Sequence, residues 1–260
     1  MLKIFKYSFY DVLRSRWTII YFLFFFISTL SLLYLSNNLS KAITSLMNII
    51  LTIIPLISMI FGVMHYYNSR DFIDLLLSQP VKRKEVFIGQ YLGLSISLAA
   101  GFLLGILIPF LFYGLSVSVD VWNFAVLAAA GVFLTFIFVA LSFFISLLND
   151  DKIKGFGIAI LTWLYLAVLY DGMILLVFVS FNEYPLETPA LIFTLLNPID
   201  LSRVMVLLQL DISALMGYTG AVFNKFFGTT GGMVLSMASM LIWIILLLIG
   251  INKVSSKKDF

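Results

Sequence analysis

Long apolar runs alternate with short polar segments along almost the whole chain. A helix needs about 20 mainly apolar residues to cross the hydrocarbon core of a bilayer. Six runs meet this requirement, and the third and fourth are long enough to tilt or to extend beyond the membrane. The pattern predicts an all-α polytopic membrane protein with one transmembrane domain over residues 1–260. The predicted spans cover residues 17–36, 42–65, 86–114, 121–148, 155–180 and 232–251.

The composition narrows the class of protein. The chain is 62% hydrophobic and 11% charged, and its mean hydropathy of +1.10 lies outside the range of soluble domains. It has no cysteine, and its one histidine, His65, fits an interfacial aromatic belt beside Tyr66 and Tyr67. No span has the spacing of a nucleophile–base pair or of metal ligands. We therefore expect no catalytic residue, no metal site, no directly bound cofactor and no nucleic-acid partner.

The basic residues are unevenly divided between the two sides of the membrane. With six spans both termini lie on one side, which then collects thirteen of the sixteen lysines and arginines. The positive-inside rule places that side in the cytoplasm and residues 181–231 outside. The three basic residues expected outside are Lys41, Arg203 and Lys225.

The N-terminal stretch does not match a signal peptide, so we expect the whole chain in the mature protein. Residues 2–13 place Leu2, Phe5, Phe9, Val12 and Leu13 near one helical face. This pattern favours a helix that lies in the membrane interface before the first span. The alternative is a cytoplasmic extension of that span.

A charged segment separates the second and third spans. Ser69 can cap a helix, Asp71 and Asp74 suit its first turns, and Pro80 ends it. Phe72, Leu75 and Leu76 share one face at i, i+3, i+4 spacing. The segment is either a short amphipathic helix or a surface loop whose following basic residues meet anionic lipid. Those basic residues are Lys82, Arg83 and Lys84.

The stretch "LLLSQPVKRKEVFIGQYLG", residues 75–93, resembles the first cytoplasmic loop of ABC-2 type permeases. The six spans, the interfacial helix and the long outer loop fit that family along the whole chain. The resemblance implies a coupling helix that seats on an ABC ATPase, which uses ATP and Mg²⁺, and pairing with a second copy of this chain. The implied coupling residues are Asp71, Phe72, Asp74, Leu75, Leu76, Lys82 and Arg83.

Three further stretches resemble one branch of the family, the NosY permeases of nitrous oxide reductase maturation. They are "RSRW" (14–17), "VLYDGMILLVF" (168–178) and "LLNPIDLSRVMVLLQL" (195–210). This likeness implies a NosF-like ATPase, a NosD-like periplasmic partner, a role in copper-site assembly and a bacterial inner-membrane location. The segment "NSRDFIDLL" departs from that branch, which carries a Glu and a Gly-Thr-Leu, so single contacts are not transferred. The implied periplasmic docking residues are Asn197, Pro198, Asp200 and Arg203.

Asp171 is a carboxylate inside the fifth span, where burial costs about 2.5–3.5 kcal/mol on insertion scales. Its candidate functional roles are a proton relay, a cation contact or a polar tie between subunits, and its structural role is a carboxyl bonded to neighbouring helices. We favour the structural role because no second buried ionisable residue is evident. In the outer loop Asn197 suits a helix cap with Pro198 in the first turn. Glycines between residues 217 and 232 are expected to loosen the return to the sixth span.

Met233, Met237 and Met240 form a helical stripe that indicates packing more than a Cu(I) path. The chain lacks the Gly-x-x-x-x-Gly-Lys-Ser/Thr loop, so it does not hydrolyse ATP by the P-loop route. We therefore expect a non-catalytic membrane subunit of an ATP-driven complex. The alternatives are a generic ABC-2 exporter of a lipid, drug or peptide, and an intramembrane enzyme.

Overall fold

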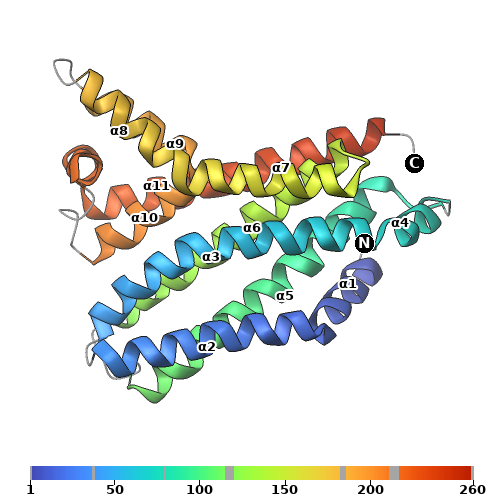
Figure 1. Cartoon of the computed structure of the whole chain (residues 1–260), viewed down its shortest axis with the longest axis horizontal. Helices are drawn as coiled ribbons and strands as arrows, with labels where there is room; N and C mark the ends of the chain where they lie inside the picture. The colour runs from blue at the N-terminus through green and yellow to red at the C-terminus, as the bar shows by residue number, and fades with distance from the viewer. Residues whose placement is uncertain are drawn as a thin grey trace.

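The computed structural model describes residues 2–36, 39–78, 80–114, 120–181, 186–210 and 217–258, without the side chains of residues 187 and 217–229. These parts of the chain form an elongated helical bundle with no strand (Figure 1). The helices are α1 (Leu2–Arg14), α2 (Arg16–Ser36), α3 (Leu39–Asn68), α4 (Arg70–Leu77), α5 (Arg83–Phe112), α6 (Val121–Leu148), α7 (Lys152–Leu164), η2 (Tyr165–Leu169), α8 (Tyr170–Ser180), α9 (Glu187–Leu196), α10 (Pro198–Gln209) and α11 (Gly217–Lys257).

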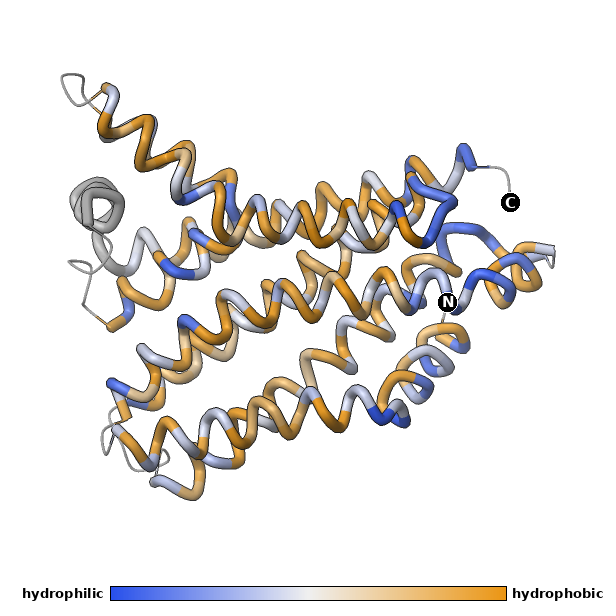
Figure 2. Tube along the Cα trace, viewed as in Figure 1, coloured by the Kyte–Doolittle hydropathy of each residue, from blue (hydrophilic) through white to orange (hydrophobic). Residues whose placement is uncertain are grey.

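The six predicted spans are confirmed, and most extend a few residues further than the apolar runs suggested. Helices α2, α3, α5 and α6, the continuous helix Lys152–Ser180 and the segment Thr230–Lys257 are each long and apolar enough to cross a membrane. Figure 2 shows the apolar positions running along the middle of these helices. A bent pair, α9 and the following α10, turns by 113° and is a broken span or a re-entrant loop. The sequence did not predict this pair.

Three spans form the core of the bundle. In α3, α5 and α6 more than half of the apolar window is buried, whereas in the helix Lys152–Ser180 only 11% is buried. Small residues allow close helix packing in membranes. A methyl group added at Gly105 of α5 would lie 2.9 Å from Cβ of Phe25 on α2, and one at Gly62 of α3 would collide with Ser142 of α6. The outer spans therefore expose apolar faces to lipid or to other proteins.

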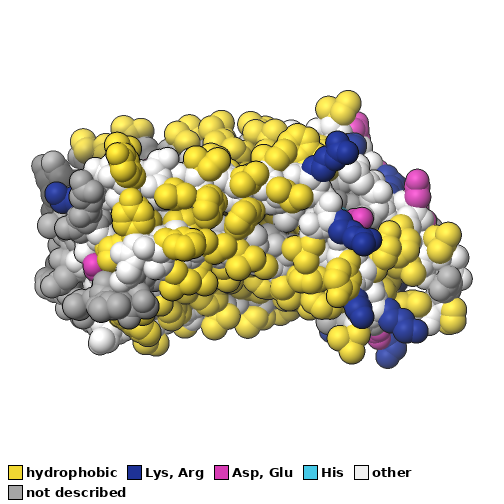
Figure 3. Space-filling view, turned by 90° about the horizontal axis from the view of Figure 1, so that it is seen from below, with side chains coloured by type: hydrophobic (Ala, Val, Ile, Leu, Met, Phe, Trp, Pro, Cys, Tyr) yellow, Lys and Arg dark blue, Asp and Glu magenta, His cyan; other side chains and the backbone are white. Residues whose placement is uncertain are grey.

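The two ends of the bundle differ in charge. Helices α1 and α4, the α6–α7 junction and the end of α11 lie together (Figure 1), and we call this the basic end. Figure 3 shows basic side chains gathered at one end, beside a broad apolar band. Helices α9 and α10 lie toward the opposite end. This separation is the one that the charge pattern predicted, and its assignment to the cytoplasm stays a prediction.

Two local expectations have different outcomes. The N-terminal stretch is a separate helix, because the non-helical Ser15 divides α1 from α2. The expected loosening after residue 217 is wrong, because α11 runs unbroken from Gly217 to Lys257. A glycine in a helix costs only about 1 kcal/mol, whereas an unsatisfied backbone group in hydrocarbon costs several.

Candidate functional site

The segment between α3 and α5 folds as the short helix α4, which projects at the basic end (Figure 1). Ser69 precedes this helix but its side chain makes no capping hydrogen bond, so the predicted cap is wrong. The backbone of Ser69 instead continues from α3, accepting from Ile73 N–H at 2.9 Å and donating to His65 O at 3.0 Å. Helix α4 is thus joined to the end of span two by a tight turn.

The inward face of α4 differs from the predicted one. Ile73 is buried in the core, and Leu76 and Leu77 pack against it. Because residues 72, 73, 75, 76 and 77 are all apolar, spacing alone did not show which face turns inward. Phe72 instead stacks on Tyr7 of α1, with 4.8 Å between ring centroids. Leu75 is 58% exposed, so it is the large apolar side chain that α4 offers to a partner.

The charged residues predicted for coupling separate into two groups. Asp71, Asp74 and Lys82 are exposed around α4 and the start of α5. Arg83 is bound within the chain, because its Nη1 donates to the backbone oxygen of Lys258 at 2.6 Å. Arg83 therefore ties the start of α5 to the end of α11, a contact that the sequence did not indicate.

A polar clamp joins the α3–α4 turn to the α6–α7 junction. Arg70 donates to the backbone oxygen of Asp150 at 3.1 Å and lies 3.4 Å from its Oδ1. Tyr67 donates from its hydroxyl to the backbone oxygen of Asn149 at 2.7 Å, and Lys152 donates to Asn68 Oδ1 at 3.2 Å. The root of α4 is thus bonded directly to the beginning of span five.

The end of α11 completes this clamp. Lys258 places its Nζ 2.8 Å from Asp150 Oδ1 and 2.7 Å from the backbone oxygen of Leu147. The hydrogen bond and the charge of Lys258, with a smaller contribution from Arg70, hold the pKa of Asp150 below its usual value. Asp150 therefore stays ionised between these cations, and it connects α4, span five and the C-terminal end of the chain.

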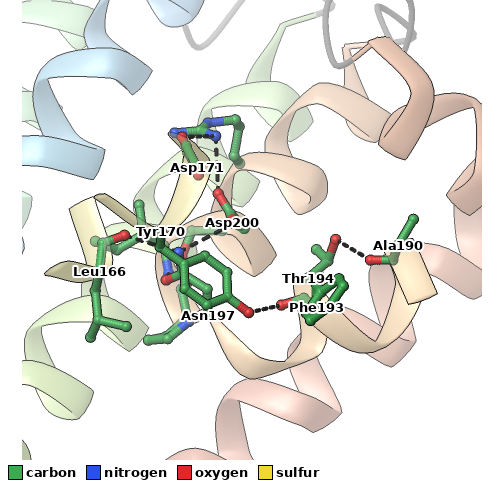
Figure 4. A network of polar contacts seen from close by, with 12 residues as sticks. Leu166, Tyr170, Asp171, Ala190, Phe193, Thr194, Asn197 and Asp200 are labelled. Atoms are coloured by element: carbon green, nitrogen blue, oxygen red, sulfur yellow. Dashed lines mark hydrogen bonds and ion pairs between the residues drawn. The ribbon is translucent and has the colours of Figure 1, made fainter. Parts of the chain in front are cut away.

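A second polar network lies between span five and the bent pair α9–α10 (Figure 4). Arg203 Nη1 lies 3.0 Å from Asp171 Oδ2 and 2.9 Å from Asp200 Oδ1. Asn197 Nδ2 donates to Asp200 Oδ2 at 3.2 Å. Tyr170 donates from its hydroxyl to Phe193 O at 2.7 Å. This set bonds α8 to both helices of the pair.

The centre of this network is Asn197, which is fully buried. It caps α10 as predicted, because its Oδ1 accepts from the Ile199 N–H at 3.0 Å, and Pro198 occupies the first turn. Its Nδ2 also donates to Leu166 O at 2.9 Å. Leu166 belongs to the π-helical turn η2, a class of turn that is often found at functional sites.

The structure corrects the expectation for Asp171. Its side chain is 41% exposed and ion-paired, and two further ionisable residues, Arg203 and Asp200, lie in the same network. The sequence missed them because α9–α10 folds back against span five. The expected bond to a neighbouring helix is present, as the ion pair with Arg203 of α10. Asn197, Pro198 and Asp200 are buried, so direct contact with a partner falls to Arg203 and its exposed neighbours.

The other candidates fit packing roles. Met240 is buried, and Met233 and Met237 pack against the core. Within the described ranges, no group of three or more histidine, aspartate or glutamate side chains is placed to hold a metal ion. His65 lines a hollow beside α1, and its Nε2 is buried with no hydrogen-bond partner among the described residues.

Comparison with known proteins places these features in a family. A family model described as an ABC-2 family transporter protein matches residues 2–251. The chain belongs to this family. Two relatives are each named "Probable ABC transporter permease protein NosY". The one from Stutzerimonas stutzeri is 23% identical over 212 residues, covering 75% of this chain and 76% of the relative. The one from Pseudomonas aeruginosa is 24% identical over 225 residues, covering 80% of this chain and 81% of the relative.

The resemblance inferred from residues 75–93 is therefore confirmed. An ABC-2 permease is the membrane subunit of an ABC transporter, and membership in this family implies an ABC ATPase as partner. The assignment of α4 as the segment that meets the ATPase stays a prediction. One polar network lies at the start of span five, and the other lies near its middle, at Leu166, Tyr170 and Asp171.

Proposed function

We propose that this chain carries the ATP-driven motion of a NosF-like ATPase across the membrane during copper-site maturation of nitrous oxide reductase. The observation that carries the proposal is the continuous helix Lys152–Ser180, span five. Its first residues are bonded to the root of α4 through Asn68 and Arg70. Its middle part is bonded to α10 through Leu166 and Asp171. Movement of α4 therefore displaces α9–α10 through a single rigid element.

The remaining parts of the complex follow from this arrangement. The basic end lies in the cytoplasm, where the ATPase binds α4 and uses ATP and Mg²⁺, while this chain binds no cofactor itself. Two copies pair through apolar faces that the monomer leaves uncovered. A NosD-like protein meets α9–α10 on the periplasmic side, where Ile192 and Leu196 are exposed and Arg203 is partly exposed. Asn197, Pro198 and Asp200 position that surface from inside.

Deletion of the gene in its native host tests the proposal. We expect the nitrous oxide reductase polypeptide to be made and exported but to lack copper, measured by metal analysis of the purified enzyme. Restoration by the unaltered chain, and not by Leu75→Asp, would tie the defect to ATPase coupling. A fully copper-loaded reductase in the deletion strain would overturn the maturation role and favour a generic exporter.

A further inference from the structure

We propose that the outward face of α1 binds the phosphate of an anionic phospholipid, and that the bound lipid acts on α4 through Tyr7. The lipid site itself does not depend on the proposed function. The effect on ATPase coupling rests on it, because it requires α4 to be the segment that meets the ATPase. The two parts are therefore argued and tested separately.

Helix α1 has two faces of opposite character. Ile4, Ser8 and Val12 are buried, and the α1 backbone at Phe9 accepts from Ser97 of α5 at 3.1 Å. The opposite face is exposed and follows helical spacing. Its members are Lys3, Lys6, Tyr7, Tyr10, Asp11 and Arg14.

This outward face carries an excess of positive charge. Within the described residues, the ion pairs involve Arg70, Arg203 and Lys258, and none involves a basic residue of α1. Three cations stand there beside one carboxylate, Asp11. A surface whose cations form no ion pair among the described residues, at the edge of an apolar band, is complementary to an anionic membrane surface.

The face is also hollowed. Lys3, Lys6, Tyr10 and their neighbours line a hollow of about 470 Å³. A second hollow of about 540 Å³ lies between α1 and the ends of α2, α3 and α4, and it shares Tyr7, Asp11 and Arg14 with the first. Both volumes lie in the range of small-ligand pockets. A headgroup held at the basic hollow therefore has adjoining space for its glycerol and first acyl carbons.

The walls of the second hollow favour a lipid over a free phosphate ion. Trp17, Phe61 and Phe72 contribute aromatic surface to it. Tyr7, Tyr10 and Trp17 are each more than half exposed, as is typical of side chains at a membrane interface. Basic groups beside exposed aromatic rings suit a molecule with a phosphate at one end and hydrocarbon at the other.

One contact connects this site to α4. Tyr7 stacks on Phe72 with 4.8 Å between centroids and 29° between ring planes. Both rings line the second hollow. A headgroup that draws α1 toward the membrane surface therefore moves Phe72 and, with it, α4. The lipid charge thereby sets the position from which α4 meets the ATPase.

Tryptophan quenching tests the site. The full chain keeps only Trp17, with Trp122, Trp163 and Trp243 changed to Phe, and is placed in phosphatidylcholine nanodiscs containing a minor brominated lipid. We expect brominated phosphatidylglycerol to quench Trp17 more than brominated phosphatidylcholine at equal mole fraction. A matched chain that keeps only Trp122, near the opposite end, should be quenched equally by both. Each of Lys3→Gln, Lys6→Gln and Arg14→Gln should reduce the preference about fivefold.

Several results would overturn the site. One is equal quenching of Trp17 by the two lipids. Another is loss of the preference when inorganic phosphate is added, which would make a free phosphate the ligand. A third is loss of the preference when the ATPase is bound, which would assign the face to that protein.

ATP hydrolysis by the assembled complex tests the link to α4. We expect Tyr7→Leu, which removes the ring stacked on Phe72, to lose the dependence of ATPase rate on phosphatidylglycerol. Tyr7→Phe is the matched control, since it keeps the ring that stacks on Phe72 and should keep this dependence. Equal behaviour of the two variants would overturn the transmission step. If substitutions in α4 do not change the ATPase rate at all, the proposed function is wrong, whereas the lipid site is unaffected by that result.

Discussion

Arg203 of α10 forms an ion pair with Asp171 of span five, with 3.0 Å between Nη1 and Oδ2. The same Nη1 lies 2.9 Å from Oδ1 of Asp200. One guanidinium therefore serves two carboxylates in different surroundings, since Asp200 is buried and Asp171 is partly exposed. Loss of the cation should consequently cost more than loss of the exposed anion.

We expect Arg203→Gln to destabilise the chain by about 3–5 kcal/mol, because it leaves the buried Asp200 carboxylate without its cation. Asp171→Asn should cost less than about 1 kcal/mol, as for other partly exposed ion pairs. Thermal unfolding of both variants in detergent measures the difference, with Lys41→Gln as a control. Equal losses for the two variants would contradict this ranking.

Asp171→Asn should also leave assembly with the ATPase and its activity largely unchanged. Asparagine keeps the size and hydrogen-bonding capacity of the side chain and removes only its charge. The measurement is pull-down of the ATPase together with reductase activity in cells. Loss of function in a fully assembled complex would mean that the charge itself is required, as in a proton or cation path.

Asn197→Asp should weaken the contact between α10 and span five while retaining the helix cap. Aspartate still accepts from the Ile199 N–H, but it cannot donate to Leu166 O or to Asp200. We expect a loss of about 1–3 kcal/mol, the cost of leaving buried groups unsatisfied. Hydrogen exchange should then rise in α9 and α10 before the core helices. Unchanged exchange there would remove Asn197 from its central role.

Leu75→Asp should separate the ATPase from the membrane subunit without affecting insertion. Leu75 is exposed on α4, and a side chain that is a hot spot of an interface costs about 2 kcal/mol or more when truncated, which is about thirtyfold in affinity. Ile153→Asp is a matched control, since Ile153 is exposed at the same end of the bundle on α7. Co-purification from solubilised membranes measures the effect. Normal recovery of the ATPase with Leu75→Asp would remove α4 from the interface.

The contacts of Asp150 should make stability depend on pH. Its pKa in the folded chain is lowered by Lys258 and Arg70, so its contribution is complete above the ordinary carboxyl pKa of about 3.9. The contribution is lost as pH falls through the lower folded-state value. Asp150→Asn should therefore reduce Tm at neutral pH, and the difference from the unaltered chain should vanish in acid and shrink in high salt. A difference that persists in acid would contradict the electrostatic origin.

The assignment of the basic end to the cytoplasm is testable because the chain has no cysteine. Ser256 and Thr188 are exposed at the two ends, whereas Ser255 is buried and unsuitable for labelling. An impermeant maleimide should label Thr188→Cys in intact spheroplasts and Ser256→Cys only after permeabilisation. The reverse pattern would invert the topology.

The sequence predicted the spans because long apolar runs determine them. Except for the sixth span, the predicted and observed ends differ by at most three residues, and α6 matches the predicted residues 121–148. It did not predict the partners of Asp171, because Arg203 lies 32 residues away and meets it only after α9–α10 folds back. Nor did it show that Lys258 binds Asp150, since a terminal lysine also fits the general charge asymmetry. Residues 182–185, part of the expected outer loop, lie outside the described residues.

The turn η2 gives span five one more residue than a regular helix of the same length would hold. The Tyr170 N–H donates to Tyr165 O, five residues earlier instead of four. Each helical residue turns the chain by about 100°, so everything after η2 is rotated by that amount relative to an unbroken α-helix. Deleting Ala167 would restore a regular helix, turn Asp171 away from Arg203, and withdraw the Leu166 oxygen from Asn197. The outer half of span five is therefore set in its register by a single inserted position.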